Sequence, residues 1–188
     1  MEVKRHGVWR EPVWRPAGNA LRATLPRQLR TWLYDSASLT LRLQQVSGGD
    51  FRVRLLSQRW QRPLLNERLA LAMGHHEYAM VRQVQLICKG EPWVYARSVI
   101  PARTMSGAGR QLSKLGSRPL GAFLFARDGV VREPMEIACV HPNEMIYDDA
   151  TAGAGVKQQA VWGRRSVFRL EQKPLLVSEF FLPAIPAR

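Results

Sequence analysis

The chain is poor in cysteine and in acidic residues, and each shortage narrows the class of protein. Two cysteines, Cys88 and Cys139, occur in 188 residues, and neither belongs to a C-x-x-C pair. A disulfide scaffold is therefore excluded, and we interpret both as free, buried thiols. Asp and Glu number 15 against 28 Lys and Arg, a net charge of +13, which favours anionic partners such as nucleic acid, an anionic membrane surface or an acidic metabolite.

Long hydrophobic runs are also missing. No window is long enough to span a bilayer, and the polar N-terminus never reaches the apolar stretch of a signal peptide. We therefore expect a soluble, cytoplasmic protein without stable membrane insertion. A hydrophobic content of 46% over 188 residues suits one domain, 1–188, with its own core, and we expect a monomer.

The excess arginines are scattered along the chain. Nucleic-acid binders usually concentrate their positive charge in one run or on one helix face, and stacking motifs are missing here. We therefore expect no nucleic-acid partner. Dispersed charge more often keeps a surface solvated and attracts small anions.

Two hairpins are the clearest elements in the pattern. Residues 78–88 and 93–100 alternate apolar and polar side chains around a Lys-Gly-Glu-Pro turn, and residues 166–170 and 175–182 do the same around 171–174. Further strands are predicted at 51–55 and at 130–140, where Pro134 indicates an edge or a bulge.

Helices are predicted between these strands. Pro26 precedes a helical spacing at Leu29, Trp32 and Leu33, Ser36 or Ser38 can cap a helix through Leu43, and shorter helices are expected near 112–115 and 119–124. Residues 1–22 are predicted to form an irregular arm and residues 141–160 a polar, mobile loop. The result is an α+β fold with a single antiparallel sheet of about six strands, helices packed beside it, and an enclosed ligand cavity.

Two charged residues occupy strand positions that should be apolar. Arg82 shares its face with Met80, Val84 and Leu86. Glu179 shares its face with three apolar residues of its own strand, Leu175, Val177 and Phe181. A charge removed from water must be paired, bound to a metal or neutralised. A buried salt bridge is one explanation; a closed pocket in which each charge meets a group of a small polar ligand is the other.

Other polar clusters carry weaker signals. The run 75–77 (His-His-Glu) and the acidic residues after His141 lack the spacing of a metal site, so no metal is expected. Arg164 and Arg165 could clamp a phosphate, but two solvent-facing arginines at a strand entry are the more usual arrangement. Nucleophile elbows, phosphate loops and dinucleotide fingerprints are absent, and no cofactor is implied.

Five blocks, in order, resemble the chorismate pyruvate-lyase family. They are Gly-Glu-Pro-Trp at 90–93, Ala-Arg-Ser-Val-Ile-Pro at 96–101, Leu-Gly-Ser-Arg-Pro-Leu-Gly at 115–121, Trp-Gly-Arg-Arg-Ser at 162–166, and Lys-Pro-Leu-Leu at 173–176 with Glu-Phe-Phe-Leu-Pro at 179–183. The resemblance covers the chain from about Pro26 onward. It implies an antiparallel sheet with helices over an enclosed cavity, and a cofactor-free lyase that makes 4-hydroxybenzoate and pyruvate from chorismate, the first committed step of ubiquinone synthesis.

The resemblance also assigns residues. By position, Arg82 matches the carboxylate-binding arginine and Glu179 the carboxylate at the product hydroxyl. Leu120 matches a residue that lines the ligand and offers a backbone amide, and Leu39 takes a position where better-known members have a methionine. Whether Glu179 acts as a base or only as a hydrogen-bonding anchor stays open. A sealed cavity would hold the flat product tightly, so we expect product release to limit turnover.

The alternative function is a non-catalytic domain that binds a small aromatic acid. Sensor domains of some bacterial transcription factors are similar in fold to this family. Such domains usually follow a helix-turn-helix, and the roughly 25 residues before Pro26 are too few for one, so the enzyme is favoured.

Overall fold

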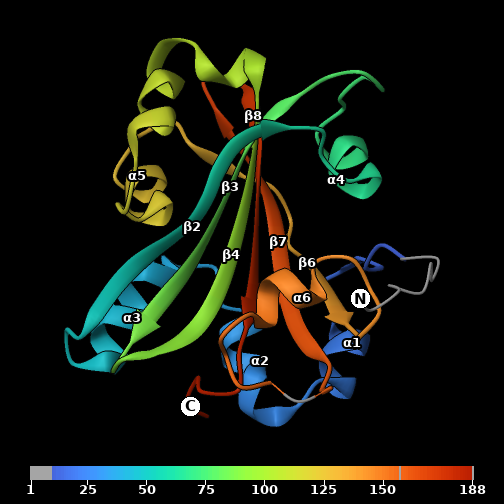
Figure 1. Cartoon of the computed structure of the whole chain (residues 1–188), viewed down its shortest axis with the longest axis vertical. Coiled ribbons are helices and arrows are strands. Elements are labelled where there is room, and N and C mark those ends of the chain that lie inside the picture. The colour runs from blue at the N-terminus through green and yellow to red at the C-terminus, as the bar shows by residue number, and fades with distance from the viewer. Residues whose placement is uncertain (1–9, 157, 188) are drawn as a thin grey trace, which may run out of the picture.

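The protein is described from a computed structural model, which covers residues 10–156 and 158–187 (Figure 1). The strands are β1 (Arg15–Pro16), β2 (Phe51–Gln61), β3 (Ala79–Cys88), β4 (Glu91–Pro101), β5 (Val131–Arg132), β6 (Glu136–Val140), β7 (Val161–Leu170) and β8 (Lys173–Phe181). The α-helices are α1 (Asn19–Thr24), α2 (Arg27–Leu33), α3 (Leu39–Ser47), α4 (Leu65–Ala70), α5 (Leu120–Phe125) and α6 (Tyr147–Thr151). Two 3₁₀ segments, η1 (Ala102–Met105) and η2 (Gly107–Lys114), follow β4.

All described strands form one antiparallel sheet in the order β1-β6-β7-β8-β4-β3-β2, and β5 pairs with β7. The α+β class with helices beside one antiparallel sheet is therefore confirmed. Both predicted hairpins are present as β3–β4 and β7–β8, and Pro134 separates β5 from β6. Of the described strands, six have five or more residues and two, β1 and β5, have two residues each. The expected number of about six strands therefore agrees with the longer ones.

Helices cover both faces of the sheet (Figure 1). We call the face that carries Arg82 the Arg82 face, and the other the opposite face. On the Arg82 face, α2 and α3 pack over one half of the sheet, and η2 with α5 packs over the other half. The segments around α4 and α6 pack on the opposite face. Residues two apart along each strand therefore enter the same apolar layer.

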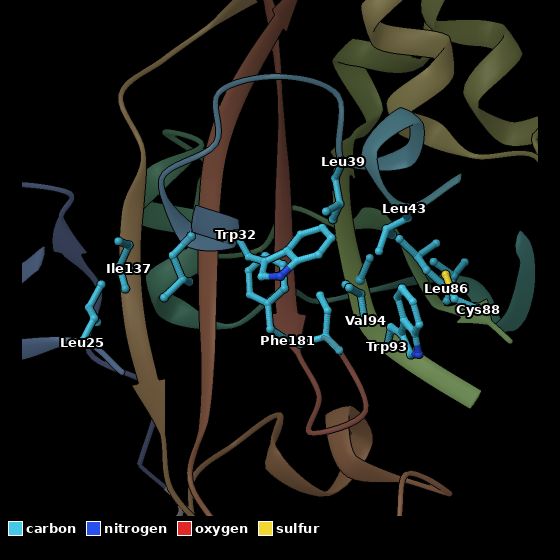
Figure 2. Packing of buried hydrophobic residues seen from close by; sticks show 14 residues of the cluster. Leu25, Trp32, Leu39, Leu43, Leu86, Cys88, Trp93, Val94, Ile137 and Phe181 are labelled. Carbon is cyan, nitrogen blue, oxygen red and sulfur yellow. The ribbon is translucent and has the colours of Figure 1, made fainter. Parts of the chain in front are cut away.

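The larger core on the Arg82 face is built around Trp32 of α2. Its indole is fully buried against Phe181 of β8, at a centroid distance of 6.4 Å, and Leu39 and Leu43 of α3 pack in the same cluster (Figure 2). A second apolar cluster lies under η2 and α5. The gap between these two clusters, in the middle of the face, is where the polar residues of interest lie.

The segment 141–160, expected to be a loop, contains the helix α6. Tyr147 and Ala150 of α6 are buried against the opposite face, and Asp149 accepts a hydrogen bond of 3.1 Å from Gln83. The sequence pattern missed this helix because it has five residues and its flanks are rich in small and polar residues. The mobility of the segment stays a prediction.

The N-terminal arm is partly described. Residues 1–9 lie outside the described residues, and residues 10–18 have no regular structure apart from β1, after which α1 begins at Asn19. The arm lies against the body: the Glu11 carboxylate accepts bonds of 2.7 Å from the backbone N–H groups of Leu65 and Asn66, and Trp14 contacts Phe180 at a centroid distance of 5.8 Å.

The cysteines form no disulfide, and the helices are short. Both cysteines are free, Cys88 buried and Cys139 half-buried. Over the described part of the chain, no helix combines the length and the apolar character that crossing a membrane requires.

Candidate functional site

Arg82 and Glu179 lie on the same face of the sheet, on strands separated by β4. Arg82 of β3 pairs with Ser98 of β4, which pairs with Val177 of β8; in the next row of the same face, Ala96 pairs with Glu179. Two strand spacings and one two-residue step place their Cα atoms about 12 Å apart. Two long side chains at this separation can reach opposite ends of one small ring.

A narrow pocket lies between the two charges. Its volume is about 30 Å³. Its walls come from strands β2, β3, β4 and β8, from α3 and from the start of α5, through Thr40, Val53, Arg82, Val84, Leu86, Ala96, Ser98, Pro119, Leu120, Gly121, Val177 and Glu179. A single water needs about 10–15 Å³ by such a measure, so the pocket as it stands admits water and no aromatic acid. Binding of a ring would require α3 and α5 to separate.

Arg82 is a buried cation for which the described residues supply no carboxylate. Its side chain is 1% exposed, its Nη2 donates to the backbone carbonyls of Gly116 at 2.9 Å and Arg118 at 3.0 Å, and its Nε is buried without a partner. No ion pair within 4 Å includes it among these residues. Burial lowers the pKa of Arg82 to about 10, so it remains a cation at neutral pH. The geometry suits a carboxylate from a ligand.

The buried arginine of the opposite face provides the contrast. Arg97, 4% exposed, donates from Nε and Nη2 to the two carboxylate oxygens of Glu67 at 2.7 and 3.1 Å. Larger hollows exist near it and along the N-terminal arm, about 260 and 650 Å³. The small pocket is the stronger site candidate because the cation in its wall lacks such a partner.

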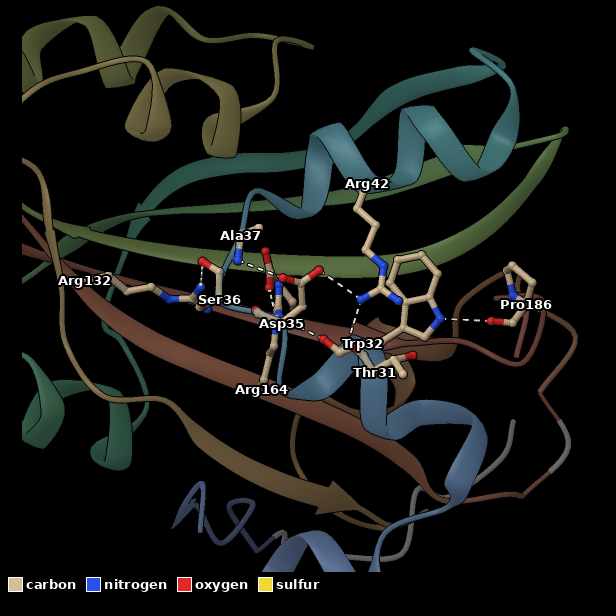
Figure 3. Close-up of polar contacts among 10 residues, drawn as sticks. Thr31, Trp32, Asp35, Ser36, Ala37, Arg42, Arg132, Arg164 and Pro186 are labelled. Carbon is tan, nitrogen blue, oxygen red and sulfur yellow. Dashed lines mark hydrogen bonds and ion pairs between the residues drawn. The ribbon is translucent and has the colours of Figure 1, made fainter. Parts of the chain in front are cut away.

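Glu179 is not paired with Arg82 but with Arg164 of β7. The Arg164 Nε donates to the Glu179 carboxylate at 2.7 Å, and its Nη1 donates to the carbonyls of Trp32, at 2.8 Å, and Asp35 (Figure 3). Arg164 thus joins β8 to the segment between α2 and α3. Arg82 and Glu179 therefore form no salt bridge with each other. For Glu179 the explanation by a buried salt bridge is confirmed, with Arg164 as the partner, whereas for Arg82 it is wrong within the described residues.

The expectation that Arg164 and Arg165 face solvent is also wrong. Their side chains are 1% and 6% exposed, because β7 begins at Val161 and lies between β6 and β8. Arg164 points to the Arg82 face, opposite Glu179, and Arg165 points to the other face, where it pairs with Glu136 at 2.7 Å. Extending the alternation of the second hairpin back to Trp162 would have placed Arg164 beside Glu179.

The two leucines of the predicted site have different positions. Leu120, the first residue of α5, lines the pocket. Leu39 is 4% exposed in the apolar cluster with Leu43 (Figure 2) and is not among the pocket-lining residues; its neighbour Thr40 is. A Cβ atom added at Gly121 would lie 3.0 Å from the Thr40 Oγ1. Helices α3 and α5 therefore meet closely above the pocket.

The candidate metal residues do not gather. In the described ranges, no three side chains of His, Cys, Asp or Glu are arranged to hold an ion. The His75 ring instead lies 3.0 to 3.1 Å from Arg62 Nη2.

Comparison with known proteins places these residues in context. A family model described as chorismate lyase matches residues 10–188. A probable chorismate pyruvate-lyase of Methylococcus capsulatus is 41% identical over 157 residues, covering 84% of this chain and 96% of the relative. A protein with the same description from an Azoarcus species is 45% identical over 166 residues, covering 86% and 87%.

Solved structures give a more distant likeness. PhnF from Mycobacterium smegmatis aligns with a TM-score of 0.57 at 12% identity, over 80% of this chain and 65% of that chain. The ligand-binding domain of a putative GntR-family transcriptional regulator from Bordetella bronchiseptica aligns with a TM-score of 0.53 at 19% identity, over 72% and 86%. At these identities the likeness concerns the fold alone.

Proposed function

This chain belongs to the chorismate lyase family and is a lyase, and we propose that it converts chorismate to 4-hydroxybenzoate and pyruvate. The observation that carries the proposal is the buried, unpaired Arg82 in the wall of a pocket that Glu179 also lines. A ligand with an anionic group at one end and a hydroxyl at the other satisfies both side chains.

The reaction needs no oxidant or cofactor. The ether bond between the ring and the enolpyruvyl group breaks, and the ring carbon that bears the hydroxyl loses its hydrogen as a proton. The ring becomes aromatic, and the enolpyruvyl fragment takes up a proton at its methylene carbon to become pyruvate. Because aromatisation supplies the driving force, the protein contributes mainly by holding the reacting bonds in a productive geometry.

Arg82 would bind the ring carboxylate. Its Nη2 donates to two backbone carbonyls, which leaves the Nε–H of the guanidinium for the ligand. A charge-assisted hydrogen bond in a dry pocket is shorter and stronger than one in water. Val84 and Val177, which also line the pocket, would contact the flat ring.

Glu179 would accept a hydrogen bond from the ring hydroxyl. The Arg164 Nε occupies one of its carboxylate oxygens and fixes the side chain in position, so the other oxygen is left for the ligand. This arrangement supports an anchoring role for Glu179, with Arg164 as its positioning residue. Removal of the ring proton by Glu179 stays the alternative.

Opening of the pocket would control turnover. A cavity of about 30 Å³ has to widen before chorismate enters and before product leaves, and the close contact between Gly121 and Thr40 is the point where α3 and α5 would separate. We therefore propose that product release limits turnover. A pre-steady-state burst of 4-hydroxybenzoate is expected, and strictly linear first-turnover kinetics would contradict it.

The second candidate is an effector-binding domain without catalysis. It is favoured by the fold shared with the GntR-family ligand-binding domain, whereas relatives at 37–45% identity are described as probable chorismate pyruvate-lyases. Purified protein mixed with chorismate decides between the two: formation of 4-hydroxybenzoate, followed by its ultraviolet absorbance, supports the lyase. Binding of chorismate without turnover would support the effector domain.

The wider setting belongs to the same proposal. We propose that the product enters ubiquinone synthesis, and that the protein acts in the cytoplasm as a monomeric single domain, without cofactor, metal or nucleic acid. Size-exclusion chromatography of the purified chain, with and without 4-hydroxybenzoate, tests the monomer. A dimer under both conditions would contradict it.

A further inference from the structure

Arg82 and Glu179 do not provide a partner for one charged group of the substrate, its second carboxylate. Chorismate carries two carboxylates, one on the ring and one on the enolpyruvyl ether, and the ether is attached to the ring carbon next to the hydroxyl-bearing carbon. If Arg82 binds the ring carboxylate, the second carboxylate lies near the ion pair of Glu179 and Arg164, whose opposite charges balance each other. The second carboxylate therefore needs a further cation at that end. This reasoning depends on the proposed function.

Arg132 lies on the Arg82 face beyond that end of the pocket and is not one of the residues that line it. It belongs to β5, and its Nε donates to the Ser166 Oγ of β7 at 3.0 Å, while its Nη1 donates to the Ser36 carbonyl at 3.0 Å (Figure 3). Ser166 is directly opposite Val177, which lines the pocket. The next β7 residue on the same face, Arg164, holds Glu179, so the Arg132 guanidinium lies close to the Glu179 row.

No carboxylate of the described ranges lies within 4 Å of Arg132, although Glu179 and Asp35 are near enough to attract it. Other arginines of this region form ion pairs: Arg165 with Glu136 at 2.7 Å and Arg169 with Glu133 at 2.6 Å. Arg132 is half-buried and makes its two side-chain bonds to neutral oxygens. Burial, and then the nearby charge of Arg164, lower the pKa of Arg132, while the carboxylates of Glu179 and Asp35 raise it by less. An added anion would further offset the repulsion between the two guanidinium groups.

A second unpartnered group lies in the same segment. The Ser38 Oγ is buried without a hydrogen-bond partner, two residues from the Ser36 carbonyl that holds Arg132 and two residues before Thr40 in the pocket wall. A buried hydroxyl without a partner is rare in native proteins, and a ligand contact is one explanation for it. The segment 36–40 therefore contacts Arg132 at one end, through the Ser36 carbonyl, and lines the pocket at the other, through Thr40.

We propose that Arg132 binds the enolpyruvyl carboxylate of chorismate, next to the hydroxyl anchored by Glu179. The product 4-hydroxybenzoate lacks this carboxylate, because it leaves with pyruvate. Arg132 is thus a specificity residue: it favours the substrate over the product, whereas Arg82 holds both. This discrimination matters in a pocket that otherwise grips the product.

The test compares ligands with one and with two carboxylates. The monoanionic probe is 4-hydroxybenzoate; the dianionic probe is 3-(carboxymethoxy)-4-hydroxybenzoate, a stable compound with a carboxylate on an ether next to the hydroxyl. Isothermal titration calorimetry gives Kd for both probes in the wild type, Arg132→Gln, Arg132→Lys and the control Arg169→Gln, a half-buried arginine of β7 that pairs with Glu133.

Arg132→Gln is expected to weaken the dianionic probe, and to lower kcat/KM for chorismate, by roughly 10- to 100-fold, the loss of one charged hydrogen bond. Its Kd for 4-hydroxybenzoate should stay within about twofold of wild type, since that bond is never made. Arg132→Lys should recover part of the loss, and Arg169→Gln should resemble wild type.

Equal weakening of both probes would overturn the inference, because it would mean that Arg132 only supports the pocket. Unchanged affinities in Arg132→Gln would overturn it as well. Retained binding of 4-hydroxybenzoate shows that the variant is folded. A wild type that binds the probes but does not turn over chorismate would refute the proposed function, whereas the comparison of the two probes tests Arg132 by itself.

Discussion

Replacing Arg82 by methionine is expected to stabilise the ligand-free protein while it abolishes binding of 4-hydroxybenzoate. Arg82 is 1% exposed and has no counter-charge among the described residues, so the empty pocket retains a charge that favours unfolding. Methionine has a similar length and no charge. The substitution therefore separates the effect of Arg82 on the free energy of unfolding from its effect on ligand binding.

The magnitude follows from the pKa of Arg82. Burial lowers it from 12.5 to about 10, and at about 1.4 kcal/mol per unit the charge costs the fold on the order of 3 kcal/mol. Because the folded-state pKa is the lower one, this cost is complete below about pH 10 and disappears as the pH rises toward the unfolded value. Loss of the bonds to Gly116 and Arg118 removes about 0.5–1.5 kcal/mol each, which leaves a net gain of about 0–2 kcal/mol.

The assay is thermal unfolding at neutral pH with and without 4-hydroxybenzoate. A gain of 1 kcal/mol raises Tm by about 2–4 °C in a chain of this size. Ligand at 100 times its Kd should stabilise the wild type by about 2.7 kcal/mol and should not stabilise Arg82→Met. If ligand-free Arg82→Met is more than about 2 kcal/mol less stable than wild type, or if 4-hydroxybenzoate still raises its Tm, the reasoning about an anion site is refuted.

Three further substitutions separate binding from stability. Glu179→Gln should keep the fold but lower kcat/KM by roughly 10- to 100-fold, since a charged acceptor is lost; turnover equal to wild type would remove Glu179 from the site. Arg97→Ala should destabilise the chain by about 3–5 kcal/mol in urea unfolding, because it leaves Glu67 buried and unpaired; a loss below about 1 kcal/mol would contradict this. Gly163→Ala should cost about 1–3 kcal/mol, since its Cβ would lie 2.6 Å from the Phe180 ring, and an unchanged Tm would show that the ring can move.

The sequence pattern was most informative where the period of two is strict. In β3 and β8, alternation was enough to place Arg82 and Glu179 on one face, and the structure puts both in the wall of one pocket. Each hairpin has a short turn, so the pairing of neighbouring strands followed from local sequence alone. The order of the two hairpins in the sheet did not, because the β4–β8 pairing joins residues about 80 positions apart.

The partners of the site residues were harder to predict. Arg164 looked exposed because the strand was expected to begin at Ser166, and a start at Val161 changes its environment completely. Arg132 could not be placed, since β5 has two residues and its hydrogen bonds go to Ser36 and Ser166, both distant in sequence. Such contacts depend on tertiary packing that a single sequence does not display.

The most direct test of the central claim is a crystal structure of the protein with 4-hydroxybenzoate bound. We expect the ligand between α3 and α5, with its carboxylate at hydrogen-bond distance from the Arg82 Nε and its hydroxyl at hydrogen-bond distance from the Glu179 carboxylate. A ligand bound elsewhere, with Arg82 still unpaired in the wall of the closed pocket, would contradict the account.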